Sequence, residues 1–185
     1  IGGEMTYNCL GNNQYEITLT LFADCFNNNQ GVNFDAPAYV GIFDAQTGFY
    51  LRTENFYPAP FDTLDLSLNS LCYNIPPNVC VHTTTYKKQL TLPYRPGGYH
   101  IAYQRCCRNN TISNIFSPST NGATYTTFLS PEAQQVCNSN PVFNDFPPIV
   151  ICVNEPLEFD HSATDADGHT LEYSFCAPLN GASVS

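Results

Sequence analysis

The sequence predicts an all-β protein: a disulfide-stapled β-sandwich followed by the start of an Ig-like or cadherin-like β-domain. Three observations lead to this class. Several stretches alternate apolar and polar residues with the period of a half-buried strand. No stretch has a convincing helical period, so we expect no helix. Nine cysteines are spread along 185 residues, and 43% of the residues are hydrophobic, which is enough for a packed core.

The first domain is expected to span residues 1–137. Its clearest strand lies in the stretch 13–25, where Tyr15, Ile17 and Leu19 share one face and polar residues occupy the other. Further strands are expected at 37–45, 49–57, 83–94, 98–107, 123–130 and 131–137.

A long connection is expected between two of these strands, at residues 58–80. It contains four prolines and no sustained period, so we expect one short strand within it. Cys72 and Cys80 flank its Pro-Pro turn, which suggests a local disulfide between them.

The chain after Cys137 has a different organisation. Residues 138–148 are rich in Asn, Asp and Pro and are predicted to be a linker. The alternating pattern restarts in 149–185, which we interpret as an incomplete Ig-like or cadherin-like domain. We therefore expect a longer parent protein, and the beginning IGGEMTYNC suits a mature N-terminus after removal of a signal peptide.

Charge limits the partners of this protein. Charged residues make up 12% of the chain, and six Lys and Arg against sixteen Asp and Glu give a net charge of −10. This balance argues against nucleic acid and anionic membranes as partners. No stretch approaches the ~20 apolar residues of a membrane span, so we expect no membrane insertion. Other protein subunits or cell-surface components remain as partners, with glycans as a further class.

The cysteine pattern predicts disulfides and an oxidising compartment, because neither CxxC nor zinc-finger spacing with His occurs. The disulfide candidates are Cys9, Cys25, Cys72, Cys80, Cys106, Cys107, Cys137 and Cys152. Because the total is odd, one cysteine is free, pairs with another chain, or has its partner beyond Ser185.

Adjacent cysteines at the end of the 98–107 strand raise a specific question of pairing. Alternation places Cys107 on the core side and Cys106 on the opposite side, unless a bulge intervenes. Each could then bond a different neighbour. Cys25 is our candidate for Cys107 and Cys9 for Cys106, although sequence alone does not determine connectivity.

The strongest metal motif is the acidic turn at residues 165–168, Asp-Ala-Asp-Gly. Asp165 and Asp167, with Asp160 upstream, could supply the carboxylate oxygens that calcium prefers. The EF-hand pattern is not met, since His169 stands where Asp or Asn is required. Calcium is the single cofactor that the sequence suggests, and the alternative is an ordinary acidic turn.

No catalytic residue is predicted, so we expect a protein that is not an enzyme. The GxSxG, HExxH and glycine-rich phosphate-loop motifs are absent. A nucleophile formed by Cys106 or Cys107 with His82 or His100 is a chance combination in a cysteine-rich chain, and disulfide-bonded cysteines cannot act as nucleophiles.

Two features concern sugars. Asn109 begins an N-glycosylation sequon, Asn-Asn-Thr. The aromatic cluster in residues 49–61 could stack sugars or line a protein interface, and the simpler interpretation is that half of it forms core.

Three stretches resemble the N-terminal region of large surface proteins of Bacteroidota: GGEMTYNCLGNNQYEITLTLFADC, GGYHIAYQRCCRNNTISNI and FPPIVICVNEPLEFDHSATDADGHTLEYSFCAPL. Many such proteins are described as gliding-motility-associated or as type IX secretion substrates. The resemblance implies an exported, multidomain, mostly β protein at the cell surface, with an adhesive role. Residues 62–64, Asp-Thr-Leu, look like the O-glycosylation pattern of that phylum, with Thr63 as acceptor.

The leading functional hypothesis is a non-enzymatic extracellular module, structural or adhesive, within a bacterial surface protein or filament, mediating attachment or assembly. The alternative is a carbohydrate-binding module of a secreted protein. A third hypothesis is an accessory part of a secreted hydrolase.

Overall fold

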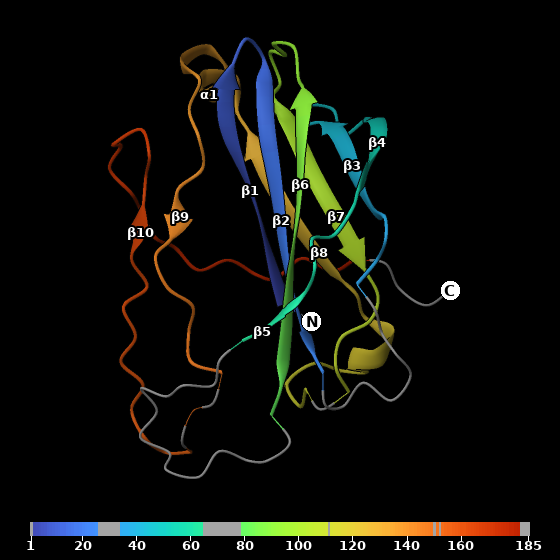
Figure 1. Ribbon diagram of the computed structural model, residues 1–185, viewed down its shortest axis with the longest axis vertical. Coiled ribbons are helices and arrows are strands. Elements are labelled where there is room, and N and C mark those ends of the chain that lie inside the picture. The colour runs from blue at the N-terminus through green and yellow to red at the C-terminus, as the bar shows by residue number, and fades with distance from the viewer. Residues whose placement is uncertain are drawn as a thin grey trace.

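The computed structural model describes residues 2–25, 34–64, 79–110, 112–149, 151 and 153–181. The described part of the chain is nearly all-β, with antiparallel sheets, which confirms the predicted class. One four-stranded sheet has the order β1-β2-β6-β5 and the other the order β4-β3-β7-β8. Figure 1 shows the first sheet in front of the second, with β9 and β10 to one side.

The first sheet contains β1 (Gly2–Gly11), β2 (Gln14–Asp24), β6 (Val81–Thr91) and β5 (Asp62–Thr63). The second sheet contains β4 (Tyr50–Phe56), β3 (Ala38–Asp44), β7 (Tyr99–Arg105) and β8 (Ala123–Leu129). The remaining elements are the 3-10 helix η1 (Pro118–Thr120), the helix α1 (Pro131–Val136), β9 (Val142–Phe143) and β10 (Ala163–Thr164).

The core lies between the two sheets and follows the predicted alternation. Ile17 and Leu19 of β2 are fully buried and face fully buried side chains of the other sheet, among them Val40, Ile42 and Ile101. Strand β2 is central, since it pairs with β1 on one side and with β6 on the other. Burial of this apolar surface is the main stabilising contribution, at roughly 25 cal/mol per Å².

Buried tyrosines direct their hydroxyls to one polar residue, Asp35. Tyr86 donates to the Asp35 carbonyl at 3.0 Å, and Tyr103 donates to the Asp35 carboxylate. Burial, followed by the nearby Asp35 charge, raises the pKa of Tyr86 to about 12. Arg105 lies 3.3 Å from the same carboxylate, so the polar ends of these core side chains have partners.

The open side of the sandwich between β4 and β6 is closed by an ion-pair cluster. Glu54 accepts from Lys88 and from Arg52, each at 2.7 Å. Partial burial alone would raise the pKa of Glu54, but these two cations lower it below its ordinary value.

Two elements differ from the sequence predictions. Strand β1 was not predicted, although Met5 and Tyr7 alternate with polar residues and are buried. Residues 131–137 were predicted as a strand, and this is wrong: residues 131–136 form α1. The Ser130 hydroxyl accepts from the Ala133 N–H and caps the helix, and Pro131 occupies its first turn, where no donor is needed. The expectation of no helix is therefore wrong too.

Beyond residue 141 the described chain contains little regular structure. Strands β9 and β10 pair antiparallel over two residues each. In the described part of 149–181, Ala163–Thr164 is the only strand, so the alternating pattern of this region forms no longer strand there. The linker and domain boundaries stay predictions.

Candidate functional site

Three disulfides join described cysteines: Cys9–Cys137, Cys25–Cys80 and Cys106–Cys107. Their sequence separations are 128, 55 and 1 residues. The first closes almost the whole sandwich into one covalent ring. Several disulfides of this kind indicate an oxidising compartment.

The proposed pairing of Cys25 with Cys107 is wrong, because Cys25 is bonded to Cys80. Asp24 at the end of β2 is the register partner of Val81 at the start of β6. The next residues outward, Cys25 and Cys80, therefore face each other with Cα atoms 5.3 Å apart. This bond also excludes the local Cys72–Cys80 disulfide; Cys72 itself lies outside the described residues.

The adjacent cysteines bond each other rather than two different neighbours. Strand β7 ends at Arg105, so the alternation of faces does not extend to Cys106 and Cys107. The proposed Cys9–Cys106 pairing is therefore wrong. Cys9 is bonded instead to Cys137, the residue that ends α1 with φ of 55°.

The remaining cysteines have different positions. Cys176 is exposed and is free of any disulfide. Cys152 is a disulfide candidate that falls outside the described residues, so its pairing stays a prediction.

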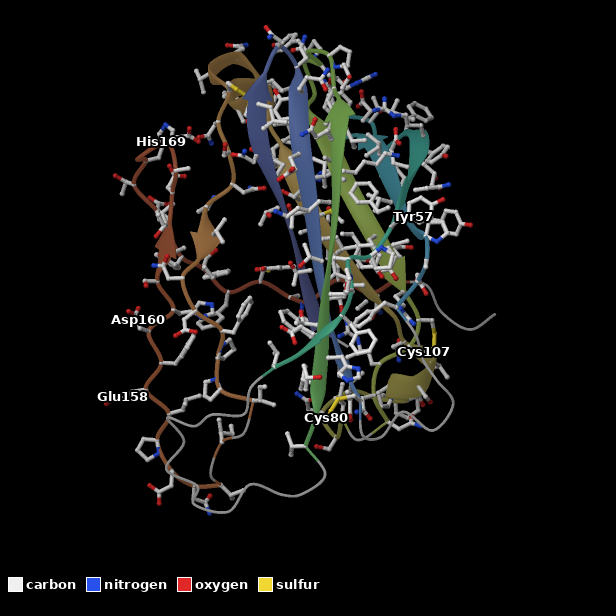
Figure 2. All side chains as sticks on the ribbon, in the orientation of Figure 1. Tyr57, Cys80, Cys107, Glu158, Asp160 and His169 are labelled. Atoms are coloured by element: carbon white, nitrogen blue, oxygen red, sulfur yellow. A yellow bond between two sulfur atoms is a disulfide. The ribbon has the colours of Figure 1, made fainter. Side chains whose placement is uncertain are left out.

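The acidic turn brings together two of the three predicted calcium ligands. Single ligand atoms of Asp165, Asp167 and His169 lie within 4.8 Å of one another. Asp160 is not in this group, and its Oδ1 accepts from the Ser162 N–H. In Figure 2 His169 lies near the end of the turn, and Asp160 lies on the same segment at a greater distance from the turn.

The carboxylates of this turn already have structural roles. Asp165 Oδ1 accepts from the N–H groups of Asp167 and His169, both at 3.0 Å, and these contacts contribute to lowering the Asp165 pKa, the His169 backbone bond being the largest cause. Asp167 Oδ2 accepts from the Ser139 N–H at 2.7 Å. Two carboxylates with one imidazole differ from the all-oxygen set that calcium prefers. Calcium binding here stays a prediction.

The imagined cysteine nucleophiles have no free thiol, because Cys106 and Cys107 are bonded to each other. A second cluster joins Cys25, Cys80 and His82, and its two sulfurs are likewise in a disulfide. Figure 2 shows Cys80 at the lower end of the sandwich.

The two glycosylation candidates occupy different environments. Thr63 is exposed on the short strand β5. Asn109 is partly buried, and its Nδ2 atom, where an N-linked glycan would attach, donates to Asp24 at 3.5 Å. Glycosylation at either residue stays a prediction.

A row of rings crosses the outer face of the second sheet. Phe43 is the register partner of Tyr50 on one side and of His100 on the other, and His100 is the partner of Phe128. Ring centroids are 5.8 Å apart for Phe43 and Tyr50 and 5.0 Å apart for His100 and Phe128. We call Tyr50, Phe43, His100 and Phe128 the aromatic row.

Small residues form the next row on the same face. Gly41 is the partner of Thr53 and of Ala102, and Ala102 is the partner of Thr126. A Cβ atom at position 41 would lie 2.6 Å from Cε2 of Phe43, so the Phe43 ring lies over Gly41 and against the strand. Glycine at this position therefore lets the ring lie down on the sheet.

The third row is mostly polar. It contains the partner pairs Tyr39–Asn55 and Gln104–Thr124. Thr124 is also contacted by the chain near residue 180, since its N–H donates to the Leu179 carbonyl at 3.4 Å and its hydroxyl to the Asn180 carbonyl at 2.6 Å. The aromatic row lies at the opposite end of the sheet and stays open: Tyr50 is 59% and Phe128 46% exposed.

Across these three rows the face carries no Asp, Glu, Lys or Arg, although the chain has sixteen acidic residues. Sequence reasoning singled out aromatic residues in 49–61, but it included only Tyr50 of this row. The signal that could have found the others is the parity of each strand, since Phe43, His100 and Phe128 all alternate with core residues.

The site and fold define a class: a disulfide-bonded antiparallel β-sandwich with an uncharged, partly aromatic sheet face. Comparison with protein-family models, curated proteins and solved structures gave no match. In the part of the chain that the structure describes, no helix has the length and apolar character needed to cross a membrane.

Proposed function

We propose that this chain is a non-enzymatic extracellular module, structural or adhesive, of a larger bacterial surface protein. The observation that carries the proposal is the disulfide between Cys9 and Cys137, which holds both ends of the sandwich together over 128 residues. Such a bond forms and persists in oxidising surroundings outside the cytoplasm. The disulfide suits a protein that must stay folded where no chaperone refolds it and where it is not replaced by newly made protein.

Two further features support a structural role. The chain after the sandwich is joined to β1 by two hydrogen bonds: the Asn140 N–H donates to the Tyr7 carbonyl at 2.9 Å, and the side-chain Oδ1 of Asn140 accepts from the Tyr7 N–H at 2.8 Å. These bonds pair part of the free edge of β1, which would otherwise be open to association with other chains. The resemblance to Bacteroidota surface proteins is consistent with the same role.

The test is labelling of intact cells of the source organism with a membrane-impermeant amine reagent. We expect this protein to be labelled without lysis, while a cytoplasmic protein is labelled only after lysis. Cells lacking the gene are expected to attach less to surfaces. Labelling that requires lysis would overturn the extracellular assignment, and unchanged attachment would overturn the adhesive one.

A further inference from the structure

We propose that the outer face of the β4-β3-β7-β8 sheet binds a neutral oligosaccharide, with the aromatic row as its stacking platform. This inference rests on the proposed extracellular function and names the ligand class and the site.

The shape of the aromatic row fits a linear ligand. Neighbouring strands of a sheet are about 4.8 Å apart, so four aligned side chains span roughly 14 Å. The members of the row are register partners across four strands, with an irregularity in the β3–β4 register between Ile42 and Phe43. The Phe43 ring lies over Gly41 and is partly exposed. A pyranose has an apolar C–H face that stacks on such rings, and its repeat is comparable to the strand spacing.

Hydrogen-bonding groups accompany the rings, as sugar hydroxyls require. Thr53 and Thr126 lie one row away from the rings, at either side of Gly41 and Ala102. The Thr53 hydroxyl is 2.9 Å from the Tyr50 hydroxyl, which orients both groups. Because the Phe43 ring covers Gly41, the hydroxyl-bearing edge of a sugar would approach this row at Ala102 and Thr126.

The lack of charged side chains on this face favours neutral ligands over charged ones. A face without Lys or Arg has no attraction for uronic-acid polymers, nucleic acids or anionic lipids. The chain as a whole has a net charge of −10, but this face has no Asp or Glu. The face itself therefore gives no attraction for basic proteins. Neutral sugars need neither kind of charge.

The experiment is affinity electrophoresis of the full chain in native gels that contain β-glucan, xylan or galactomannan, with alginate as an acidic control. We expect at least one neutral polysaccharide to retard the protein and alginate not to do so. Tyr50→Ala and Phe128→Ala should each weaken the retardation about tenfold in apparent affinity. Tyr50→Phe keeps the ring and should retain most of the retardation.

The matched control is Phe116→Ala, because Phe116 is 92% exposed and lies in the loop before β8, away from the aromatic row. It should bind as the original chain does. All four substitutions are at exposed or half-exposed positions, so the thermal unfolding midpoint should stay unchanged and report that each variant is folded.

Several results would overturn the inference: no retardation by any neutral polysaccharide, retardation by alginate alone, or equal retardation of the original chain and the Ala variants. Light scattering can give one more result that would overturn the inference. A dimer that dissociates on Tyr50→Ala would assign the face to contact between copies. Surface labelling of intact cells separates the two proposals: labelling without lysis, together with no retardation by any neutral polysaccharide, contradicts the glycan site only.

Discussion

The sandwich and the segment after residue 141 have similar apolar content but very different burial. In the sandwich, side chains such as Leu19 and Ile101 are fully buried between two sheets. In the later segment Val153 is 85% exposed and Phe175 is fully exposed. The comparison teaches that alternation creates an apolar face but does not bury it. Burial requires a second face at about 10 Å, which the two sheets give each other.

The largest expected difference between the regions comes from disulfides. Replacing Cys9 and Cys137 together by Ser should lower the free energy of unfolding by about 4 kcal/mol, since the bond closes a ring of 128 residues. Cys176→Ser in the later segment should change it by less than about 0.5 kcal/mol. Denaturant unfolding under non-reducing conditions measures both. Equal effects would mean that the ring does not constrain the unfolded chain.

The next effect is that of core packing. Leu19→Ala should lower the stability by about 3 kcal/mol, because it removes fully buried methyl groups and leaves a cavity between the sheets. Leu157→Ala, at a position 54% exposed, should lower it by less than about 0.5 kcal/mol. Thermal or urea unfolding of both variants measures these changes in stability. A large effect at Leu157 would show that the later segment is packed against something in solution.

A smaller effect is expected where the two regions meet. Asp167→Ala removes the acceptor of the Ser139 N–H and should weaken the junction by about 1 kcal/mol. Amide hydrogen exchange at Ser139 should accelerate, and residues 141–181 should be cleaved faster in limited proteolysis. Asp160→Ala is the control, since Asp160 bonds only two residues away, to Ser162. Identical exchange in both variants would contradict a role for Asp167 in the junction.

The smallest expected effect is on the stability of the protein at acidic pH. Hydrogen bonds from the Thr47 hydroxyl and N–H, and then from Arg95, lower the pKa of Asp44 from 3.8 to about 2. A depressed folded-state pKa contributes stability that is present above the unfolded pKa and is lost as the pH falls from about 4 to about 2. Asp44→Asn should therefore flatten the decrease of the thermal midpoint over that range. A decrease of the same steepness in the variant would exclude Asp44 as its source.

Much of the sandwich could be predicted from sequence, because strand period and core position are encoded locally. Tyr15, Ile17 and Leu19 lie where their alternation places them. The helix after Ser130 was mistaken for a strand because six residues are too short for a helical period, and the signal lay in its cap and in Pro131.

The site was less predictable, because it depends on register between strands distant in sequence. Nothing local to Phe43 indicates that His100 lies beside it on the sheet. The same holds for the cysteines: Cys25 finds Cys80 only because β2 and β6 pair along their whole length. Alternation assigned a face to each of Cys106 and Cys107, but it could not indicate that β7 ends one residue earlier.

The ring closed by Cys9 and Cys137 has a mechanical consequence. A pull along the main chain that reaches Cys9 passes to Cys137 through the covalent bond, so the strands between these two residues do not carry it. Unravelling the chain between them, over a sequence separation of 128, would otherwise release on the order of 400 Å of length. With the bond intact that length cannot be extended, so under tension the part of the module between the two cysteines keeps its length.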